Sequence, residues 1–327
     1  MMDKAARLLV IINNVAAKAR RVRPRIEAAL RENGIKFDTH TTTRAGDATT
    51  RTRAALREGY KVIAVVGGDG TLSEAAAGFF VMDETEAVAG VPAQVNGDAA
   101  LAILPAGTGD DFARGLRGKR EALENWINAL VSHCRESGES RTRVVDVIYG
   151  SASDGAKSFI CLNVVTIGLG AEVARRVAAQ SSLTQRLPGE ARFVAAACGA
   201  LAAWRERRVR VRVDEREAIE CRSNLLAVAN GVYAGGGMMF APNARVDDGR
   251  LDVLISCGIT RATILRELPR IRKGAHLSNP NVRAVQAARV SIETDEANAL
   301  SIEADGNVRG TTPARFQIMP RALRIVF

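Results

Sequence analysis

Three continuous apolar runs restrict the fold of the first third of the chain most strongly. They are ARLLVIIN (6–13), KVIAVVG (61–67) and LAILPAGTG (101–109), each ending in a polar or glycine-containing turn. Strands that are apolar on both faces are typical of parallel sheets covered by helices on both sides. Between the runs lie another strand-like segment, IKFDTHTT (35–42), and helix-like segments around 25–31 and 48–58. The alternation predicts a doubly wound, mostly parallel α/β domain.

The sequence beyond about residue 145 has a different pattern. Apolar and polar residues alternate with a period of two, most clearly in VRVRVD (209–214), and Asp248-Gly249 is a turn signal between apolar segments. Helix-like patterns intervene only at 171–179, 192–207 and 261–273. We therefore predict a second, β-rich and mostly antiparallel sandwich-like domain. A polar segment at 135–145 is the expected linker, and 81–100 is the expected loose connection within the first domain.

Charge and composition narrow the class of function. The 327 residues carry a net charge of +10 at pH 7, so the surface attracts anions. Aromatic residues make up only 4% of the chain, which argues against a base-stacking surface and a nucleic-acid partner. Five dispersed cysteines without a CxxC pair predict reduced thiols. The most apolar helical stretch, 193–204, is too short to span a bilayer, so we expect a cytoplasmic protein without a transmembrane segment.

The segment VVGGDGTLSE (65–74) joins a strand to a helix. Thr71 and Glu74 have the spacing of a capping box. Glycines before a helix N-terminus let backbone N–H groups approach a phosphate. Asp69 has two interpretations, one as a group that holds Mg²⁺ or accepts a proton and one as a group that only binds backbone amides. The spacing matches neither the Walker P-loop nor the Rossmann fingerprint.

A second glycine-threonine loop, LPAGTGDDFARGL (104–116), follows another strand. Thr108 can donate a hydrogen bond to a phosphate. Asp110 and Asp111 add carboxylates for a metal or a substrate hydroxyl, or form the acidic first turn of a helix. Two such loops at neighbouring strand ends predict a binding cleft at the carboxyl edge of the sheet.

Together the motifs resemble the diacylglycerol kinase catalytic-domain family, in its bacterial soluble lipid kinase branch. The resemblance rests on GGDGTLSE, LPAGTGDDFAR, ANGVYAGGGMMFAPNARVDDGRLDVLI (229–255), EADG (303–306) and the closing ALRIVF. The first motif is shared with NAD kinases and phosphofructokinases, whereas the later ones narrow the match to lipid kinases. The resemblance covers nearly the whole chain. It implies an ATP-binding α/β domain over 1–138, a lipid-binding β-sandwich over 139–313 and a final strand, 314–327, that returns to the first domain.

The resemblance also implies roles for individual residues. Contacts to ATP would come from both glycine loops and the first two strands: Asn13, Thr42, Gly67, Gly68, Asp69, Gly70, Thr71, Leu72, Ser73, Glu74, Gly107 and Thr108. A structural Mg²⁺ would be held by Arg245, Asp248 and Arg250, partly through carbonyl groups, with Asp248 as the expected side-chain ligand. Asp110, Asp111, Gly235 and Gly236 would face the lipid, in a cleft between the two domains.

Three departures from the family pattern stand out. The first strand ends in IINNVAAKAR, which keeps Asn13 but lacks the usual proline and glycine. Basic residues follow this strand, and they have two interpretations. They either supply positive charge to the phosphate in place of backbone amides or form a solvated basic face; they are Lys18, Arg20 and Arg21. Ser73 replaces the usual asparagine.

The third departure concerns catalysis. The usual Asp-Gly-Glu reads Asp305-Gly306-Asn307 here, and an amide accepts no proton at neutral pH. General-base catalysis contributes about 10²–10⁴-fold, but phosphoryl transfer depends mostly on positioning and electrostatics. We therefore expect a working enzyme in which Asp69, Asp305 or Glu303 accepts the proton.

The sequence thus predicts an ATP- and Mg²⁺-dependent lipid kinase, peripherally associated with an anionic membrane surface and forming either monomers or homodimers. Two alternatives stay open. One is a small-molecule kinase of the NAD-kinase type, and the other is a kinase-derived nucleotide- or lipid-binding protein with weak or no catalysis. The arginine-rich segment 204–216 either contacts anionic headgroups or forms a solvated face.

Overall fold

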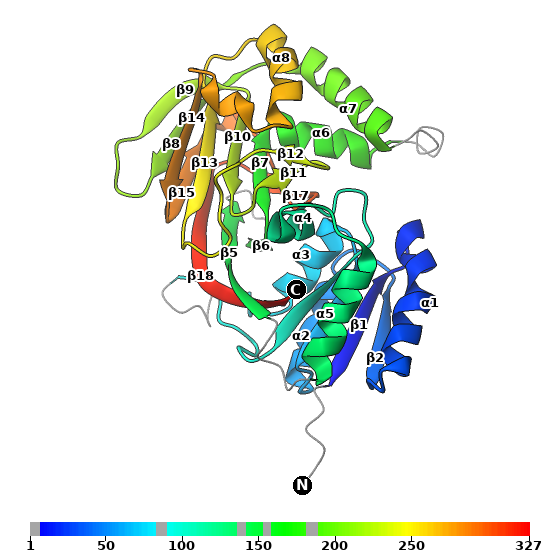
Figure 1. Cartoon of the computed structure of the whole chain (residues 1–327). Helices are drawn as coiled ribbons and strands as arrows, with labels where there is room; N and C mark the ends of the chain where they lie inside the picture. The colour runs from blue at the N-terminus through cyan, green and yellow to red at the C-terminus, as the bar shows by residue number, and fades with distance from the viewer. Residues whose placement is uncertain (1–6, 83–89, 136–141, 153–157, 181–188) are drawn as a thin grey trace. The chain divides into compact units, whose positions relative to one another are not determined.

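The computed structural model describes residues 7–82, 90–135, 142–152, 158–180 and 189–327. Its contacts divide into two units: unit 1 comprises Met1–Val147 and Met319–Phe327, and unit 2 comprises Ile148–Ile318. Two strands, β5 (Thr142–Ala152) and β18 (Ala314–Val326), run from one unit into the other (Figure 1). Parts of the predicted loose connection and linker, 83–89 and 136–141, lie outside the described residues.

Unit 1 is built on a sheet with the strand order β2-β1-β3-β4-β18. Its strands besides β18 are β1 (Leu8–Asn13), β2 (Phe37–Thr42), β3 (Val62–Gly67) and β4 (Ala100–Pro105). All four pairs of neighbours are parallel. The apolar runs predicted as strands form β1, β3 and β4, which are buried along nearly their whole length. Because the strands are parallel, the turns that follow β1, β3 and β4 lie at one edge of the sheet.

Five helices connect these strands. They are α1 (Ala17–Glu32), α2 (Asp47–Arg57), α3 (Asp69–Ala77), α4 (Asp111–Arg117) and α5 (Leu123–Arg135). The predicted capping box is wrong, because α3 begins at Asp69 and Gly68 is its N-cap. The hydroxyl of Thr71 instead accepts a hydrogen bond from Asn13, and the carboxylate of Glu74 accepts one from the N–H of Gly46. Helix α5 was not predicted from the sequence.

Unit 2 is a sandwich of two antiparallel β-sheets. One sheet has the order β14-β13-β10-β7-β16-β17, and the other contains β18, β15, β8 and β9, with β5 and β6 beside them. The strands are β6 (Phe159–Cys161), β7 (Val164–Gly168), β8 (Arg207–Val213), β9 (Ile219–Ser223), β10 (Leu225–Ala229), β13 (Leu251–Ser256), β14 (Val282–Ala287), β15 (Arg289–Glu293), β16 (Ser301–Ala304) and β17 (Asn307–Thr311). Side chains of both sheets form one apolar cluster, which includes Val211, Val253 and Phe316.

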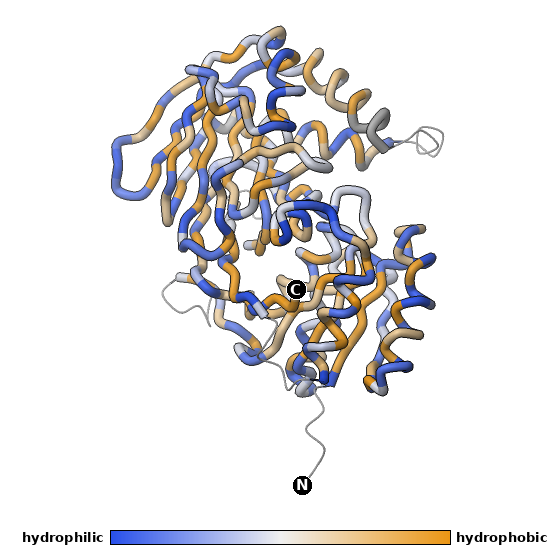
Figure 2. The backbone as a smooth tube through the Cα atoms, in the orientation of Figure 1, coloured by the Kyte–Doolittle hydropathy of each residue, from blue (hydrophilic) through white to orange (hydrophobic). Residues whose placement is uncertain are grey.

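Alternation along the strands explains this packing. In β8 the valines are buried and the arginines at 208, 210 and 212 are exposed. The predicted two-residue period therefore separates a core face from a solvent face. Figure 2 shows the alternation itself, as hydrophilic and hydrophobic colours that follow one another along the strands of unit 2. The predicted fold class, an α/β domain followed by a β-sandwich-like domain, is confirmed.

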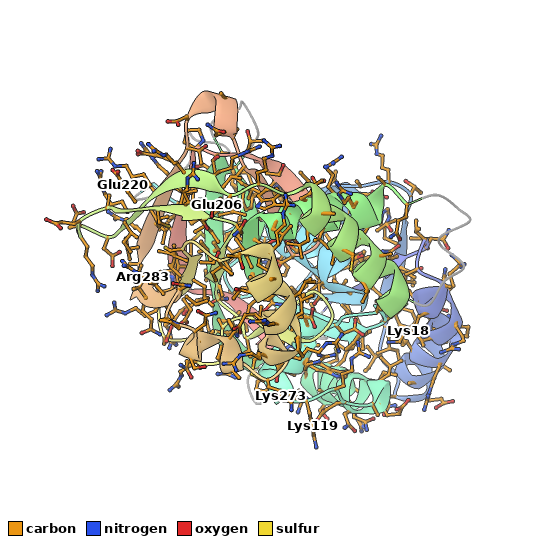
Figure 3. All side chains as sticks on the ribbon, turned by 90° about the horizontal axis from the view of Figure 1, so that it is seen from above. Lys18, Lys119, Glu206, Glu220, Lys273 and Arg283 are labelled. Carbon is orange, nitrogen blue, oxygen red and sulfur yellow. The ribbon has the colours of Figure 1, made fainter. Side chains whose placement is uncertain are left out.

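Among its described residues, unit 2 contains three α-helices, namely α6 (Leu169–Ala178), α7 (Gly189–Ala203) and α8 (Arg261–Ile271). They correspond to the three helix-like patterns of the sequence. Within the described residues, no helix is long and apolar enough to cross a membrane. Charged side chains are exposed in both units, among them Lys119 in unit 1 and Lys273 and Arg283 in unit 2 (Figure 3).

Candidate active site

The two glycine loops of unit 1 touch one another. β3 and β4 are parallel neighbours, and their register places Gly67 opposite Pro105. The chain then turns at Gly68 before α3 and at Gly107 on the way to α4. A Cβ atom on Gly107 would lie 2.5 Å from the Cα atom of Gly68, so a larger residue there requires the backbone to move. The backbones of both loops therefore meet at the carboxyl edge of the sheet.

Asp69 joins the two loops through its carboxylate. Its oxygen atoms accept hydrogen bonds from the backbone N–H groups of Asp111 and Phe112, each at 3.0 Å. These donors belong to the first turn of α4, where backbone N–H groups have no partner within the helix. Asp69 thus stabilises the start of α4 from the turn after β3. The described contacts agree with its interpretation as a group that binds backbone amides, and its role in chemistry stays a prediction.

Asn13 connects the end of β1 to α3. Its Oδ1 accepts a hydrogen bond from the N–H of Val15 at 3.0 Å, and its Nδ2 donates to Oγ1 of Thr71 at 2.7 Å. Thr42 lies opposite Asn13 in the register of β1 and β2, and its hydroxyl donates to the carbonyl of Ile12 at 3.4 Å. The structure therefore brings Asn13, Thr42 and Thr71 to the edge at which the glycine loops lie.

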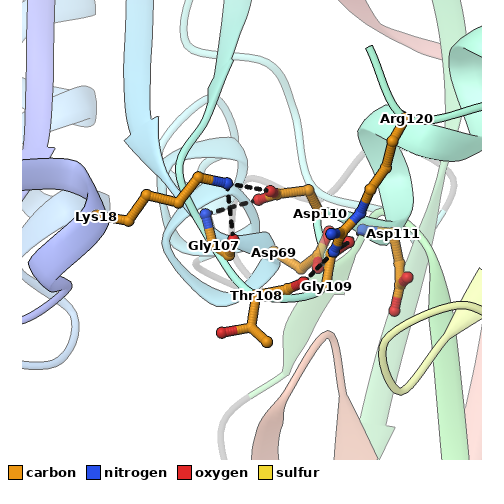
Figure 4. A network of polar contacts seen from close by, with 8 residues as sticks. All are labelled: Lys18, Asp69, Gly107, Thr108, Gly109, Asp110, Asp111 and Arg120. Atoms are coloured by element: carbon orange, nitrogen blue, oxygen red, sulfur yellow. Dashed lines mark hydrogen bonds and ion pairs between the residues drawn. The ribbon is translucent and has the colours of Figure 1, made fainter. Parts of the chain in front are cut away.

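Lys18 lies beside the second glycine loop (Figure 4). Its Nζ is 3.1 Å from the carbonyl oxygen of Gly107 and 3.3 Å from Oδ2 of Asp110. The other carboxylate oxygen of Asp110 accepts a hydrogen bond from the N–H of Gly107 at 2.8 Å. Asp110 is buried and has a left-handed backbone conformation, with φ of 49°. Lys18 therefore lies at the second glycine loop with its charge paired to that of Asp110, and the choice between its two interpretations stays a prediction.

Two arginines also donate to carbonyl groups of these turns. Arg20 donates to the carbonyl of Val15, at 3.2 Å, and Arg120 donates to those of Thr108 and Gly109, the latter at 2.7 Å. The Thr108 side chain is exposed and points away from this network in Figure 4. Its hydroxyl is therefore accessible to a ligand. Arg120 was not singled out in the sequence, because its distance of eleven residues from Gly109 gives no signal.

The other residues expected at the nucleotide differ in exposure. Gly70, Leu72 and Ser73 lie in the first turns of α3, where Leu72 and Ser73 are buried. A ligand would therefore meet this segment at its glycine end. Asp111, expected to face the substrate, is also buried, and its carboxylate is 3.8 Å from Arg114 of the same helix.

Asp305 occupies the turn between β16 and β17 in unit 2. It is buried, and its carboxylate accepts hydrogen bonds from the N–H groups of Leu162, Asn163 and Val164 at 2.7, 3.1 and 3.3 Å. Its backbone is left-handed, with φ of 47°. Asp305 therefore fixes the turn between β6 and β7. The neighbouring Gly306 has φ of 89°, which glycine adopts without strain, and this allows the tight β16–β17 turn.

Glu303 and Asn307 lie on either side of that turn. Oε2 of Glu303 accepts a hydrogen bond from the hydroxyl of Thr166 at 2.6 Å, and Oε1 accepts one from the N–H of Gly306. Burial, which disfavours the charged carboxylate, raises the pKa of Glu303 to about 7. Nδ2 of Asn307 is buried and has no hydrogen-bond partner among the described residues. A carboxyl group with a raised pKa is thus present two residues before Asp305, but not at position 307.

The glycine run in unit 2 is tied to the same turn. Gly235 and Gly236 have φ of 64° and 84°, and they connect the short strands β11 (Tyr233–Ala234) and β12 (Met238–Met239). The carbonyl of Tyr233 accepts a hydrogen bond from Nδ2 of Asn163 at 2.5 Å. Asn163 therefore links the glycine loop to the backbone segment held by Asp305. The asparagine within the apolar run CLNVVTIG was the sequence signal for this link.

The segment expected to hold Mg²⁺ offers oxygen ligands. Oδ1 of Asp248 accepts a hydrogen bond from the N–H of Arg250 at 3.0 Å, and Arg245 lies 3.7 Å from Asp247. Burial raises the pKa of Asp252, and the nearby negative charge of Asp248 adds to that effect. Carboxylates and carbonyl groups are the ligands that Mg²⁺ prefers, so this donor set fits the ion. Within the described parts of the chain, no three acidic, histidine or cysteine side chains form a metal cluster.

The chain matches two protein-family models. Residues 7–148 match the diacylglycerol kinase catalytic domain, and residues 163–327 match the YegS C-terminal NAD kinase beta sandwich-like domain. A probable lipid kinase YegS-like of Chromohalobacter salexigens is 30% identical over 96% of this chain and 91% of the relative. A diacylglycerol kinase of Mycobacterium tuberculosis is 28% identical over 86% of this chain and 82% of its own. A crystal structure of a diacylglycerol kinase from Bacillus anthracis has the same fold, with a TM-score of 0.67, 20% identity and coverage of 99% and 97%.

Proposed function

The chain belongs to the diacylglycerol kinase catalytic-domain family, in its YegS-like lipid kinase branch, and we propose that it transfers the γ-phosphoryl group of ATP to a hydroxyl group of diacylglycerol or a related lipid. The observation that carries the proposal is the contact between Gly68 and Gly107 at the carboxyl edge of a parallel sheet. Open α/β sheets bind ligands at this edge, and glycine loops expose backbone N–H groups to phosphates.

In this proposal unit 1 binds the nucleotide. The glycine loops and the exposed hydroxyl of Thr108 position the phosphates, and Lys18 adds positive charge beside Gly107. Asn13 and Asp69 act as positioning residues, because they hold α3 and α4 against the loops. When bound, Mg²⁺ neutralises the phosphates, and the 245–250 segment with Asp248 would hold a further structural ion. Positioning and electrostatics supply most of the acceleration in phosphoryl transfer.

The proposed proton acceptor is a carboxyl group, either Asp69 or a member of the 303–305 segment. Asp305 directs both oxygens to backbone N–H groups. Glu303 has a pKa of about 7, close to the pH at which a general base works best. A pH–rate profile separates the two assignments, since a base with this pKa gives a rate that rises through neutral pH.

We propose that unit 2 binds the lipid substrate and that the protein's positive charge holds it at the membrane surface. The net charge of +10 would favour association with anionic headgroups, each well-placed basic residue contributing about 1 kcal/mol. Gly235 and Gly236 of unit 2 are the residues proposed to face the lipid, whereas Asp110 and Asp111, which the sequence also suggested, are buried in unit 1. The protein would then act in the cytoplasm as a peripheral membrane protein.

A radiolabelled ATP assay against membrane lipids in mixed micelles, with Mg²⁺ varied, tests the proposal. We expect label to appear in one lipid class and to require Mg²⁺. Free NAD serves as a further acceptor in the same assay. Label in NAD but in no lipid would support the alternative of an NAD-kinase-type enzyme and contradict the proposal.

A second candidate function is nucleotide or lipid binding with weak catalysis, and the unpaired amide of Asn307 favours it. The Asn307→Glu variant distinguishes it from the first. A gain in rate of about 10²-fold, within the usual contribution of a general base, would show that the base is missing in this chain. An unchanged rate would show that another carboxyl group already serves.

A further inference from the structure

Helix α8 carries an exposed apolar stripe. Large apolar side chains are rarely exposed in the described parts of this chain, yet two of them, Leu265 and Leu268, lie one turn apart on α8. Their side chains are 50% and 37% exposed. Ala262 and Pro269, at neighbouring helical positions, are exposed as well. Because residues three and four apart share one side of a helix, these side chains form a continuous apolar surface.

Basic residues surround this stripe. Between residues 261 and 273 there are five basic residues and one acidic residue, which gives a net charge of +4. Glu267 is bound to Arg270 at 3.0 Å. Arg266, Arg272 and Lys273 are exposed and have no acidic partner among the described residues. Three cations beside two exposed leucines are therefore uncompensated by this part of the molecule.

The helix α7 is also apolar, and its last turn lies next to the start of α8. Ile264 of α8 packs against the apolar cluster formed by α6 and α7, and Arg261 donates to the carbonyl of Trp204 at 3.1 Å (Figure 1). Val194 of α7 is 56% exposed, and Cys198 is exposed four residues later. No charged residue occurs from Phe193 to Ala203. Figure 2 shows the contrast between the apolar colouring of α7 and the mixed colouring of α8.

From these observations we infer that the outer surface of α8 docks on an anionic lipid bilayer. This inference rests on the proposed function, which requires access to a lipid substrate. A helix with exposed leucines and a rim of arginine and lysine lies in a membrane interface, with the apolar side chains in the acyl boundary and the cations at the headgroups. Nucleic acid would satisfy the cations but not the leucines, and a second copy of the chain would satisfy the leucines but repel the cations.

The exposed face of β8 provides a matched control. Arg208 and Arg212 are exposed and have no acidic partner among the described residues, but their neighbours on that face are polar or charged. The β8 face therefore carries charge without an apolar component. Removing two arginines from each surface changes the net charge equally.

Vesicle co-sedimentation with four proteins tests the inference: the wild type, Leu265→Gln/Leu268→Gln, Arg266→Gln/Arg272→Gln and Arg208→Gln/Arg212→Gln. The vesicles are phosphatidylcholine with and without phosphatidylglycerol.

We expect the leucine variant to bind the anionic vesicles at least about tenfold more weakly at any salt concentration, because it loses the burial of two apolar side chains. The α8 arginine variant should lose about 30-fold at low salt, since each cation contributes about 1 kcal/mol. The β8 variant should stay within about threefold of the wild type, because its arginines do not face the bilayer.

Equal losses in the α8 and β8 arginine variants would overturn the inference, because net charge alone would then explain binding. Unchanged binding by the leucine variant would also overturn it. So would duplex DNA that binds the wild type more tightly than the anionic vesicles, or a leucine variant that changes from dimer to monomer in sedimentation while binding vesicles normally. Activity on lipid in mixed micelles should be the same in all four proteins. A wild type that docks but phosphorylates no lipid would contradict the proposed function and leave the docking surface standing.

Discussion

Asp69 in unit 1 and Asp305 in unit 2 use their carboxylates in the same way but in opposite electrostatic surroundings. Each accepts hydrogen bonds from consecutive backbone N–H groups and so fixes a turn. Around the loop that Asp69 supports, Lys18 and Arg120 contact backbone carbonyl groups. Next to Asp305 lies Glu303, a buried carboxyl group whose pKa is raised to about 7.

This difference suits the two turns to two kinds of ligand in the proposed function. At the first turn Lys18 and Arg120 accompany the carboxylates of Asp110 and Asp111, and these cations would attract a polyanion such as a triphosphate. The second combines carboxyl groups with few compensating charges, which suits the binding of a hydroxyl group or the acceptance of its proton.

The largest expected effect comes from removing the charge of Asp69. Asp69→Asn removes the carboxylate and leaves one of the two N–H groups of α4 facing an amide NH2. We expect kcat to fall about 10²–10⁴-fold if Asp69 accepts the proton, with a smaller loss of ATP affinity because the start of α4 shifts. Steady-state kinetics and nucleotide titration measure both. Asp38→Asn is the control and should leave kcat unchanged, because Asp38, on β2, accepts a hydrogen bond from the Tyr60 hydroxyl and none from α4 among the described contacts. Wild-type turnover by Asp69→Asn would assign the proton to another group.

The next effect concerns the stability of unit 2. Because the folded-state pKa of Glu303 is raised from 4.5 to about 7, the folded state binds the proton more tightly than the unfolded state. The stability that this group contributes is fully present below pH 4.5 and is lost as the pH rises through 7. Glu303→Gln should therefore match the wild type at pH 4.5 and exceed it by up to about 3 kcal/mol at pH 8.

Urea unfolding at several pH values measures this difference. Glu293→Gln is the matched control, because it makes the same substitution at an exposed position of β15. A stability difference between Glu303→Gln and the wild type that does not vary with pH would contradict the burial of an ionisable group at position 303.

The smallest effect sharpens the role of Lys18. Replacing Lys18 with Met removes a charge beside Gly107, and the KM for ATP should rise about tenfold, because charge-assisted hydrogen bonds contribute about 1.5–3 kcal/mol. The KM for lipid should not change. Lys61→Met is the matched control, because Lys61 precedes β3 at the opposite edge of the sheet and pairs with Asp98. Equal KM values in both variants would place Lys18 in a solvated basic face.

The sequence predicted the strands of unit 1 because burial on both faces leaves continuous apolar runs, as in β1 and β3. It predicted both glycine loops because a backbone that must approach another group closely requires glycine, which can be recognised in the sequence. Helix α5 was missed, although Trp126, Ile127 and Leu130 have helical spacing and are buried. The helical period of apolar residues is therefore present in this segment, although the sequence analysis did not predict a helix from it.

The contacts of the site could not be predicted in the same way. Asp69 reaches Asp111 and Phe112 across more than forty residues, and Asp305 reaches Leu162 across 143. Only the tertiary fold determines such pairs, and no local pattern records them. The pKa of Glu303 likewise depends on burial, which the sequence EADG does not reveal.

The central claim is that the contact between the two glycine loops forms the nucleotide site. Its most direct test is the dissociation constant for ATP, measured by titration calorimetry on Gly107→Ala. Gly115→Ala is the matched control, because a Cβ atom at Gly115 of α4 meets no other atom. A Cβ atom at position 107 pushes against Gly68, and misplacement of a binding loop on the order of 1 Å costs about 10²-fold. We predict ATP binding about 10²-fold weaker in Gly107→Ala and unchanged in Gly115→Ala, with both variants folded. Wild-type affinity in folded Gly107→Ala would contradict the account.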